Sequence, residues 1–158
     1  MVGSRKAFSM MELVFVIVII GLLAAVAIPK FAVTRDDAVL TQAKNTVSSI
    51  RSAIAIERQK RVLRGSYDDF TSLGGLTGYD QVLFDYFDGD NTGPRILEYS
   101  VRSCKNANLT GCWTKSSDTT YVYKMPSLGT AVTFTFDLKS RFDCDADSHT
   151  RECRLLTE

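Results

Sequence analysis

Residues 8–28, FSMMELVFVIVIIGLLAAVAI, decide the fold, because this apolar run contains a single charged side chain, Glu12. At about 1.5 Å per residue, a helix of this length reaches roughly 30 Å, the thickness of a bilayer's hydrocarbon core. A buried strand or helix of a soluble protein explains the run poorly, since the run is long and lies almost at the N-terminus. We therefore predict a helix whose apolar surface must contact lipid or other copies of the chain.

The rest of the chain reads as an ordinary globular sequence. The protein has 158 residues, of which 45% are hydrophobic, with 19 Lys+Arg against 18 Asp+Glu and a net charge of +1. This length suits one domain with a modest core, and the composition excludes a disordered or collagen-like chain. The near-neutral charge gives no sequence-wide reason to expect a nucleic-acid partner.

The N-terminal run permits three membrane roles: a cleaved secretory signal, a plain signal anchor, or a more specific assembly helix. A cleaved signal has a shorter apolar region and a small-residue exit, which this run lacks. Arg5 and Lys6 precede the run, so the positive-inside rule places the N-terminus in the cytoplasm. Glu12 is costly in hydrocarbon unless it lies at the interface, is protonated, or meets a fixed positive charge such as a free α-amine.

Residues 6–13, KAFSMMEL, with the apolar run and Pro29, resemble the signature of type IV prepilins and of the pseudopilins of type II secretion systems. The resemblance implies that a prepilin peptidase cleaves between Ala7 and Phe8 and methylates Phe8. Glu12 then becomes the fifth residue of the processed chain, where the family has its glutamate. The family usually has glycine where this chain has Ala7, which is also a small residue.

The resemblance also implies an architecture and a set of partners. Residues 1–7 are the leader, residues 8–64 a long helix with its transmembrane and assembly half at 8–29, and residues 65–158 a globular head. Glu12 of one chain neutralises the α-amine of Phe8 in a neighbour, and Pro29 kinks the helix. The expected location is the bacterial inner membrane with a periplasmic head, and the expected partners are pilin copies, the prepilin peptidase and assembly-platform proteins.

The second half of the long helix is predicted to be amphipathic. Apolar residues recur at helical spacing and form one stripe for packing on a sheet: Val39, Ala43, Val47, Ile50 and Ile54. We expect the helix to end at Leu63 or Arg64, because Gly65 is a strong C-terminal breaker.

The head is predicted to join a loop-rich region, residues 65–95, to an antiparallel sheet in residues 96–158. Within the loop region, residues 79–87 are expected to form a short helix that buries Val82, Leu83 and Tyr86. Alternating apolar residues predict three strands with one buried face. The inward positions are Leu97, Tyr99 and Val101, then Tyr121, Tyr123 and Met125, then Val132, Phe134, Phe136 and Leu138. The fold class is therefore α+β, with a long N-terminal helix packed on a small sheet.

Four cysteines, Cys104, Cys112, Cys144 and Cys153, all lie in the head. Four cysteines beyond a membrane segment indicate an oxidising compartment and allow three disulfide pairings. We favour Cys104–Cys112 with Cys144–Cys153, because each pair closes a short loop beside a strand. Zinc is the competing explanation, but no C-x-x-C spacing exists.

Calcium is the one cofactor that the acidic residues suggest. Asp143, Asp145 and Asp147 have the alternate spacing that begins a calcium loop, without its glycine and its later glutamate. Asp88, Asp90 and Asn91 form a second candidate group. Solvated loop acids are the simpler explanation of both groups.

The sequence favours a structural subunit over an enzyme. His149 is the only histidine, and a catalytic set would have to combine it with disulfide-prone thiols. We expect either a pseudopilin of a type II secretion system or a type IV pilin. The alternative is a signal-anchored periplasmic binding domain, with or without dependence on calcium, that does not polymerise. A DNA-uptake pilin has support only from Lys60, Arg61 and Arg64 near the end of the helix.

Overall fold

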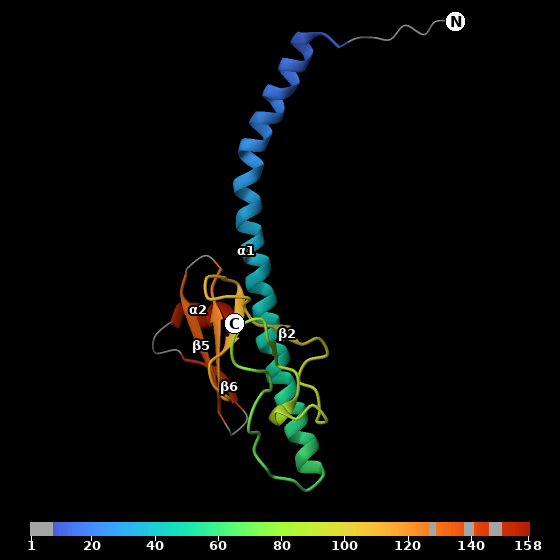
Figure 1. The fold of residues 1–158 in the computed structure, drawn as a ribbon, viewed down its shortest axis with the longest axis vertical. Coiled ribbons are helices and arrows are strands. Elements are labelled where there is room, and N and C mark those ends of the chain that lie inside the picture. Colours follow the sequence, from blue (N-terminus) through green and yellow to red (C-terminus); the bar gives the residue numbers. More distant parts are fainter. Residues whose placement is uncertain (1–7, 127–128, 138–140, 146–149) are drawn as a thin grey trace, which may run out of the picture. The chain divides into compact units, whose positions relative to one another are not determined.

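A computed structural model describes residues 8–126, 129–137, 141–145 and 150–158, with only the backbone for residues 29–34. The chain divides into two compact units, Met1–Asp37 and Ala38–Glu158. Helix α1 (Met10–Leu63) begins in the first unit and ends in the second (Figure 1). The fold class is α+β, as predicted.

The first unit consists of the N-terminal half of α1. Ser9 caps this helix, since its Oγ accepts a hydrogen bond of 3.2 Å from the backbone N–H of Glu12. The Ser9 carbonyl accepts two more from the N–H groups of Glu12 and Leu13, at 3.1 and 3.2 Å. The helix continues through Pro29 without interruption.

In the second unit, the predicted stripe of α1 is buried. Ala43, Val47, Ile50 and Ile54 belong to the hydrophobic core, and Val39 is half-buried. The helix ends at Leu63 with the hydrogen bonds of a Schellman motif. The N–H of Ser66 donates to the Arg61 carbonyl and that of Gly65 to the Val62 carbonyl, both at 2.9 Å. Gly65 has a φ of 80°, which explains why the helix stops where the sequence predicts.

A four-stranded antiparallel sheet covers this stripe, with strand order β3-β4-β5-β6 (Figure 1). Its strands are β3 (Cys112–Lys115), β4 (Thr120–Lys124), β5 (Ala131–Asp137) and β6 (Arg141–Cys144). The inward face is aromatic, and the ring centroid of Phe134 lies 5.1 Å from that of Phe142 and 5.3 Å from that of Trp113. Rings at these separations add dispersion and quadrupole attraction to their burial.

The region between α1 and the sheet contains short elements only. Strands β1 (Val82–Leu83) and β2 (Val101–Arg102) pair antiparallel, and η1 (Phe87–Gly89) is a 3₁₀ turn. Helix α2 (Thr150–Thr157) closes the chain and buries Cys153 and Leu156.

Two predicted elements are wrong. Residues 79–87 do not form a helix, because Asp80 and Phe84 have φ angles of 54° and 55°, which no right-handed helix allows. Leu83 is buried as predicted, but Val82 is 39% exposed. The strand expected around residues 97–101 is reduced to β2 at Val101–Arg102.

The strands expected at Tyr121–Met125 and Val132–Phe136 are present as β4 and β5, with these inward residues buried. Leu138 lies outside the described residues. Strands β3 and β6 and helix α2 were not predicted.

Candidate assembly surface

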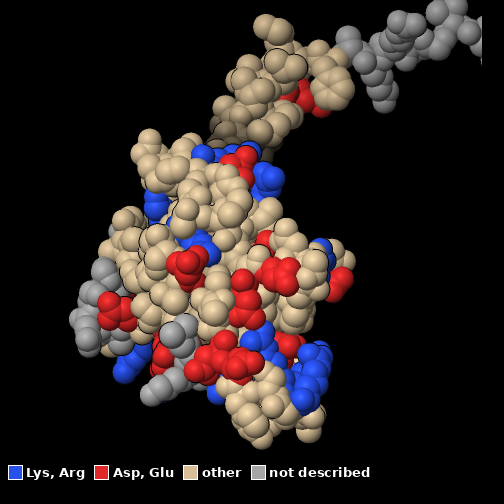
Figure 2. Space-filling model, turned by 60° about the horizontal axis from the view of Figure 1, so that its bottom comes forward, with Lys and Arg blue, Asp and Glu red and all other residues tan. Residues whose placement is uncertain are grey.

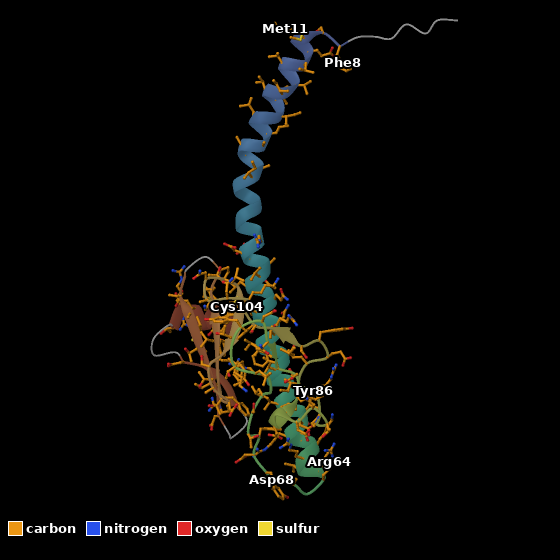
Figure 3. All side chains as sticks on the ribbon, viewed as in Figure 1. Phe8, Met11, Arg64, Asp68, Tyr86 and Cys104 are labelled. Atoms are coloured by element: carbon orange, nitrogen blue, oxygen red, sulfur yellow. A yellow bond between two sulfur atoms is a disulfide. The ribbon has the colours of Figure 1, made fainter. Side chains whose placement is uncertain are left out.

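The apolar half of α1 is the most unusual surface of the first unit. Met10–Ile28 has a mean hydropathy of 2.9, and none of it is buried within the chain. Nineteen residues of helix extend about 28 Å. By length and composition this segment is sufficient to cross a membrane, and its side chains project from the helix on all sides (Figure 3).

Two of the predicted site residues, Phe8 and Glu12, lie at the start of α1. Phe8 lies two residues before the helix and is 77% exposed. Glu12 lies in the first turn, where a carboxylate interacts favourably with the positive end of the helix dipole. It is the only acidic residue between Met10 and Ile28, and Figure 2 shows this end of the chain as almost entirely uncharged. Ala7 lies outside the described residues, and Pro29 is placed far along the helix from Glu12.

Sequence reasoning missed the role of Ser9. The spacing Ser9-x-x-Glu12 is that of a capping box, in which a serine caps the helix and a glutamate stands at its third position. The cap fixes the first helical residue at Met10. The predicted new N-terminus, Phe8, therefore lies just outside the helix, two residues before its start.

The basic residues at the other end of α1 are mostly held by the head. Arg58 Nη1 lies 2.8 Å from an Asp69 carboxylate oxygen, and Arg61 Nη2 donates to Asp88 Oδ2 at 2.5 Å. Arg64, labelled in Figure 3, has its Nη1 3.9 Å from the buried Glu57 carboxylate. Of the three residues that the sequence offered as a DNA contact, Arg61 joins α1 to the segment that follows it, and Arg64 pairs with Glu57 of α1.

Asp88 is the central acceptor of this cluster. Its Oδ1 accepts hydrogen bonds from the backbone N–H and the hydroxyl of Thr71, at 2.7 and 3.2 Å. Partial burial acts to raise the pKa of the Asp88 carboxyl, but the hydrogen bonds from Arg61 and Thr71 outweigh it, so the pKa lies below its usual value. The Arg61 guanidinium also lies over the ring of Phe70, 4.2 Å from its centroid.

Both disulfides have the pairing that we favoured. Cys104 is bonded to Cys112, and Cys144 to Cys153. The first closes a loop beside β3, and the second ties α2 to the end of β6. Each bond therefore constrains a short segment at the margin of the sheet.

Two of the candidate calcium residues, Asp143 and Asp90, have partners within the chain. Asp143 forms ion pairs through both carboxylate oxygens, with Arg51 at 3.3 Å and Arg141 at 2.9 Å. Asp147 and His149 lie outside the described residues. In the second candidate group, Asp90 accepts from the N–H and hydroxyl of Thr92 within a tight turn. Among the residues that the structure describes, no group of three His, Cys, Asp or Glu side chains is placed to hold a metal ion.

Comparison with known proteins gives one relative of known role. Over 51 residues, 32% of this chain, the sequence is 45% identical to the type IV narrow pilus major component PilA5 of Thermus thermophilus. The similar stretch covers 44% of that protein's length. No family model matches the chain, and no solved structure matches it. The similarity and the α+β fold with its apolar N-terminal helix together support a relationship to the type IV pilins.

Proposed function

We propose that this chain is the structural subunit of a type IV pilus-like filament and assembles through the N-terminal half of α1. The observation that carries the proposal is the apolar surface of Met10–Ile28, none of which its own chain covers. An apolar surface of this size is unstable in water, so lipid must cover it before assembly and other copies after assembly. The similarity to a pilus major component supports the same conclusion.

In this proposal, a prepilin peptidase removes residues 1–7 on the cytoplasmic side of the inner membrane. Cleavage leaves an α-amine on Phe8, which remains basic after methylation. The amine lies close to the positive end of the α1 dipole, so the helix itself does not stabilise it. A carboxylate partner is therefore required wherever this end leaves water.

Glu12 of a neighbouring copy is the proposed partner. A lone charge in a low-dielectric filament core costs several kcal/mol, whereas a paired charge is tolerated. Pairing Glu12 of one copy with the Phe8 amine of the next offsets adjacent helices along their axes. A simple membrane anchor has no need for a buried acid at this spacing, which argues against the non-polymerising binding domain.

The proposal includes both a pilus subunit and a pseudopilin, with assembly-platform proteins as partners in either case. The relative favours the pilus subunit, because its name describes a pilus component. A pilus subunit is recovered in fibres sheared from the cell surface, whereas a pseudopilin stays with the cell envelope. Shearing cells that produce the chain at its native level distinguishes the two.

Mass spectrometry of the assembled protein tests the processing step. We expect a chain that begins with N-methylated Phe8, and an assembled chain that still begins with Met1 would contradict the proposal.

The pairing step is tested by Glu12→Gln, which keeps the shape of the side chain and removes its charge. We expect unchanged membrane insertion. The yield of filament should fall about tenfold or more, because an unpaired buried charge costs several kcal/mol and about 1.4 kcal/mol already corresponds to a tenfold change in an equilibrium constant. Glu152→Gln is the matched control, since it removes the same charge from α2. Wild-type filament yield from Glu12→Gln would show that the pairing is not used.

A further inference from the structure

Helix α1 begins at Met10, although the residues before it favour a helix. Arg5, Lys6 and Ala7 are residue types of high helix propensity. Beside the apolar run they would allow a helix to continue toward the N-terminus, past the predicted cleavage bond between Ala7 and Phe8. The start of α1 at Met10 therefore requires a local cause.

Ser9 supplies this cause. Its Oγ accepts a hydrogen bond of 3.2 Å from the backbone N–H of Glu12, so Ser9 occupies the cap position and Phe8 lies outside the helix. A capping residue has a non-helical backbone, which stops the helix from growing past it. The neighbouring residues add to the same signal. Glu12 is at the third helical position, and Phe8 and Leu13 stand at the two positions of a hydrophobic staple.

Phe8 is therefore accessible. It is labelled at the start of α1 in Figure 3 and is 77% exposed. Proteolysis acts on exposed and locally open chain, whereas a residue inside a helix must first be freed from its hydrogen bonds. A helix that continued over Phe8 would have to unwind by about one turn before each cleavage.

We propose that Ser9 is a positioning residue for removal of the leader. By ending α1 it keeps Phe8, and with it the cleaved bond, outside the helix, where the peptidase can bind it. This inference rests on the proposed function, which supplies the cleavage. Ser9 acts through the backbone and not by contact with the reacting groups, so another side chain that caps a helix equally well should serve in its place.

The cap determines where the helix starts and not whether the helix forms. In lipid, Met10–Ile28 stays helical without a cap, because backbone groups in hydrocarbon have no other partners. Loss of the cap should therefore move the start of the helix toward the leader instead of unfolding α1. Membrane insertion should not change, since the apolar run is untouched.

Cleavage of the full-length precursor by a prepilin peptidase tests the role of Ser9. Ser9→Ala removes the cap, which contributes about fivefold to the equilibrium between the two helix starts. We expect KM to rise about threefold to fivefold with kcat unchanged, because only precursor with an open bond can bind. A lower kcat with unchanged KM would place the hydroxyl at the reacting groups and overturn the inference. Ser48→Ala, the same change at an exposed position inside α1, is the control and should be cleaved like wild type.

Rescue distinguishes capping from direct recognition of the hydroxyl. Asparagine caps a helix as well as serine does, whereas threonine keeps the hydroxyl but caps less well. We expect Ser9→Asn to have the wild-type KM and Ser9→Thr to lie between Ser9→Asn and Ser9→Ala. Cleavage of Ser9→Asn as slow as that of Ser9→Ala, or of Ser9→Ala as fast as that of wild type, contradicts the inference and leaves the proposed function standing. A wild-type precursor that the peptidase does not cleave contradicts the processing step of the proposed function and the inference with it.

Discussion

Replacing Asp88 by Asn should destabilise the head at neutral pH by an amount that the structure defines. Oδ2 of Asp88 accepts from Arg61, and Oδ1 accepts from the N–H and hydroxyl of Thr71. An asparagine has one acceptor oxygen, so its amide NH₂ must face one of these donors. The φ of 61° at this position is tolerated by both residues, which leaves backbone strain almost unchanged.

A hydrogen bond to a charged group contributes about 1.5–3 kcal/mol. The side chains of Arg61 and Asp88 are 16% and 30% exposed, so solvent weakens the pair and the lower part of that range applies. We expect a loss of about 1.5–2 kcal/mol, equivalent to a fall in the melting midpoint of roughly 5–8 °C. Near-ultraviolet circular dichroism of the full chain in detergent reports this midpoint, because Trp113 is buried in the core.

The pH dependence identifies the cause. The pKa of Asp88 is lowered in the folded state, so its contribution is complete above the unfolded value of 3.8 and is lost as the pH falls through the folded pKa. The difference between wild type and Asp88→Asn should be constant from pH 7 to about pH 5 and shrink below about pH 4. Asp90→Asn is the control, because Asp90 is exposed and accepts only from Thr92. Equal midpoints for wild type and Asp88→Asn at pH 7 would refute the reasoning, as would a difference that persists unchanged in acid.

Three further outcomes are expected from the head. Replacing Cys144 and Cys153 by serine should lower the free energy of unfolding by about 2–3 kcal/mol, because the disulfide closes a short loop in the unfolded chain. The loss should appear as a lower urea midpoint, and an unchanged midpoint would show that α2 needs no tether. Gly111→Ala should also destabilise, because Gly111 has a φ of 73° and an added Cβ would lie 2.8 Å from Val39 Cγ1; a wild-type melting curve would contradict the close approach. Burial raises the pKa of Tyr123 to about 12. Its ionisation, followed by absorbance near 295 nm, should therefore coincide with alkaline unfolding of the head. Ionisation of Tyr123 near pH 10 in a head that is still folded would contradict this prediction.

The elements that the sequence predicts well have a strong periodic signal. The buried stripe of α1 and strands β4 and β5 follow from spacing alone, and the end of α1 follows from Gly65. The disulfide pairing follows from the short loops that each pair closes. The assembly residues Phe8 and Glu12 were identified by their register with a known motif, and their pairing stays a prediction.

Strand β3 was missed because one of its two buried side chains is charged. Lys115 points inward, where its ammonium donates to the Gly75 carbonyl at 2.9 Å and to Asp118 at 3.1 Å. A lysine at an inward position breaks the alternation that identifies a strand. The Gly75 carbonyl comes from a segment 40 residues away, so the sequence gives no sign that an inward-facing charge at this position is satisfied.

The expected helix at residues 79–87 failed for a different reason. Its apolar content was sufficient, but Asp80 and Phe84 adopt left-handed backbone angles, which apolar content does not reveal. The contacts of the basic residues of α1 were likewise hidden. Arg51 and Arg58 fall between the apolar positions in the sequence, and only the fold shows that Phe142 and Asp69 hold them against the head.

The continuity of α1 has a mechanical consequence. A pull on the Met10 end of the helix is carried by one peptide backbone to Ala43, Val47, Ile50 and Ile54, which lie inside the aromatic core. Force along a buried stripe loads its contacts together in shear, whereas force on the end of a strand would open them one after another. In a fibre built from such chains, the helix would slide out of its own head only if these contacts break together. The packing that keeps each subunit folded would then also resist its extension under load.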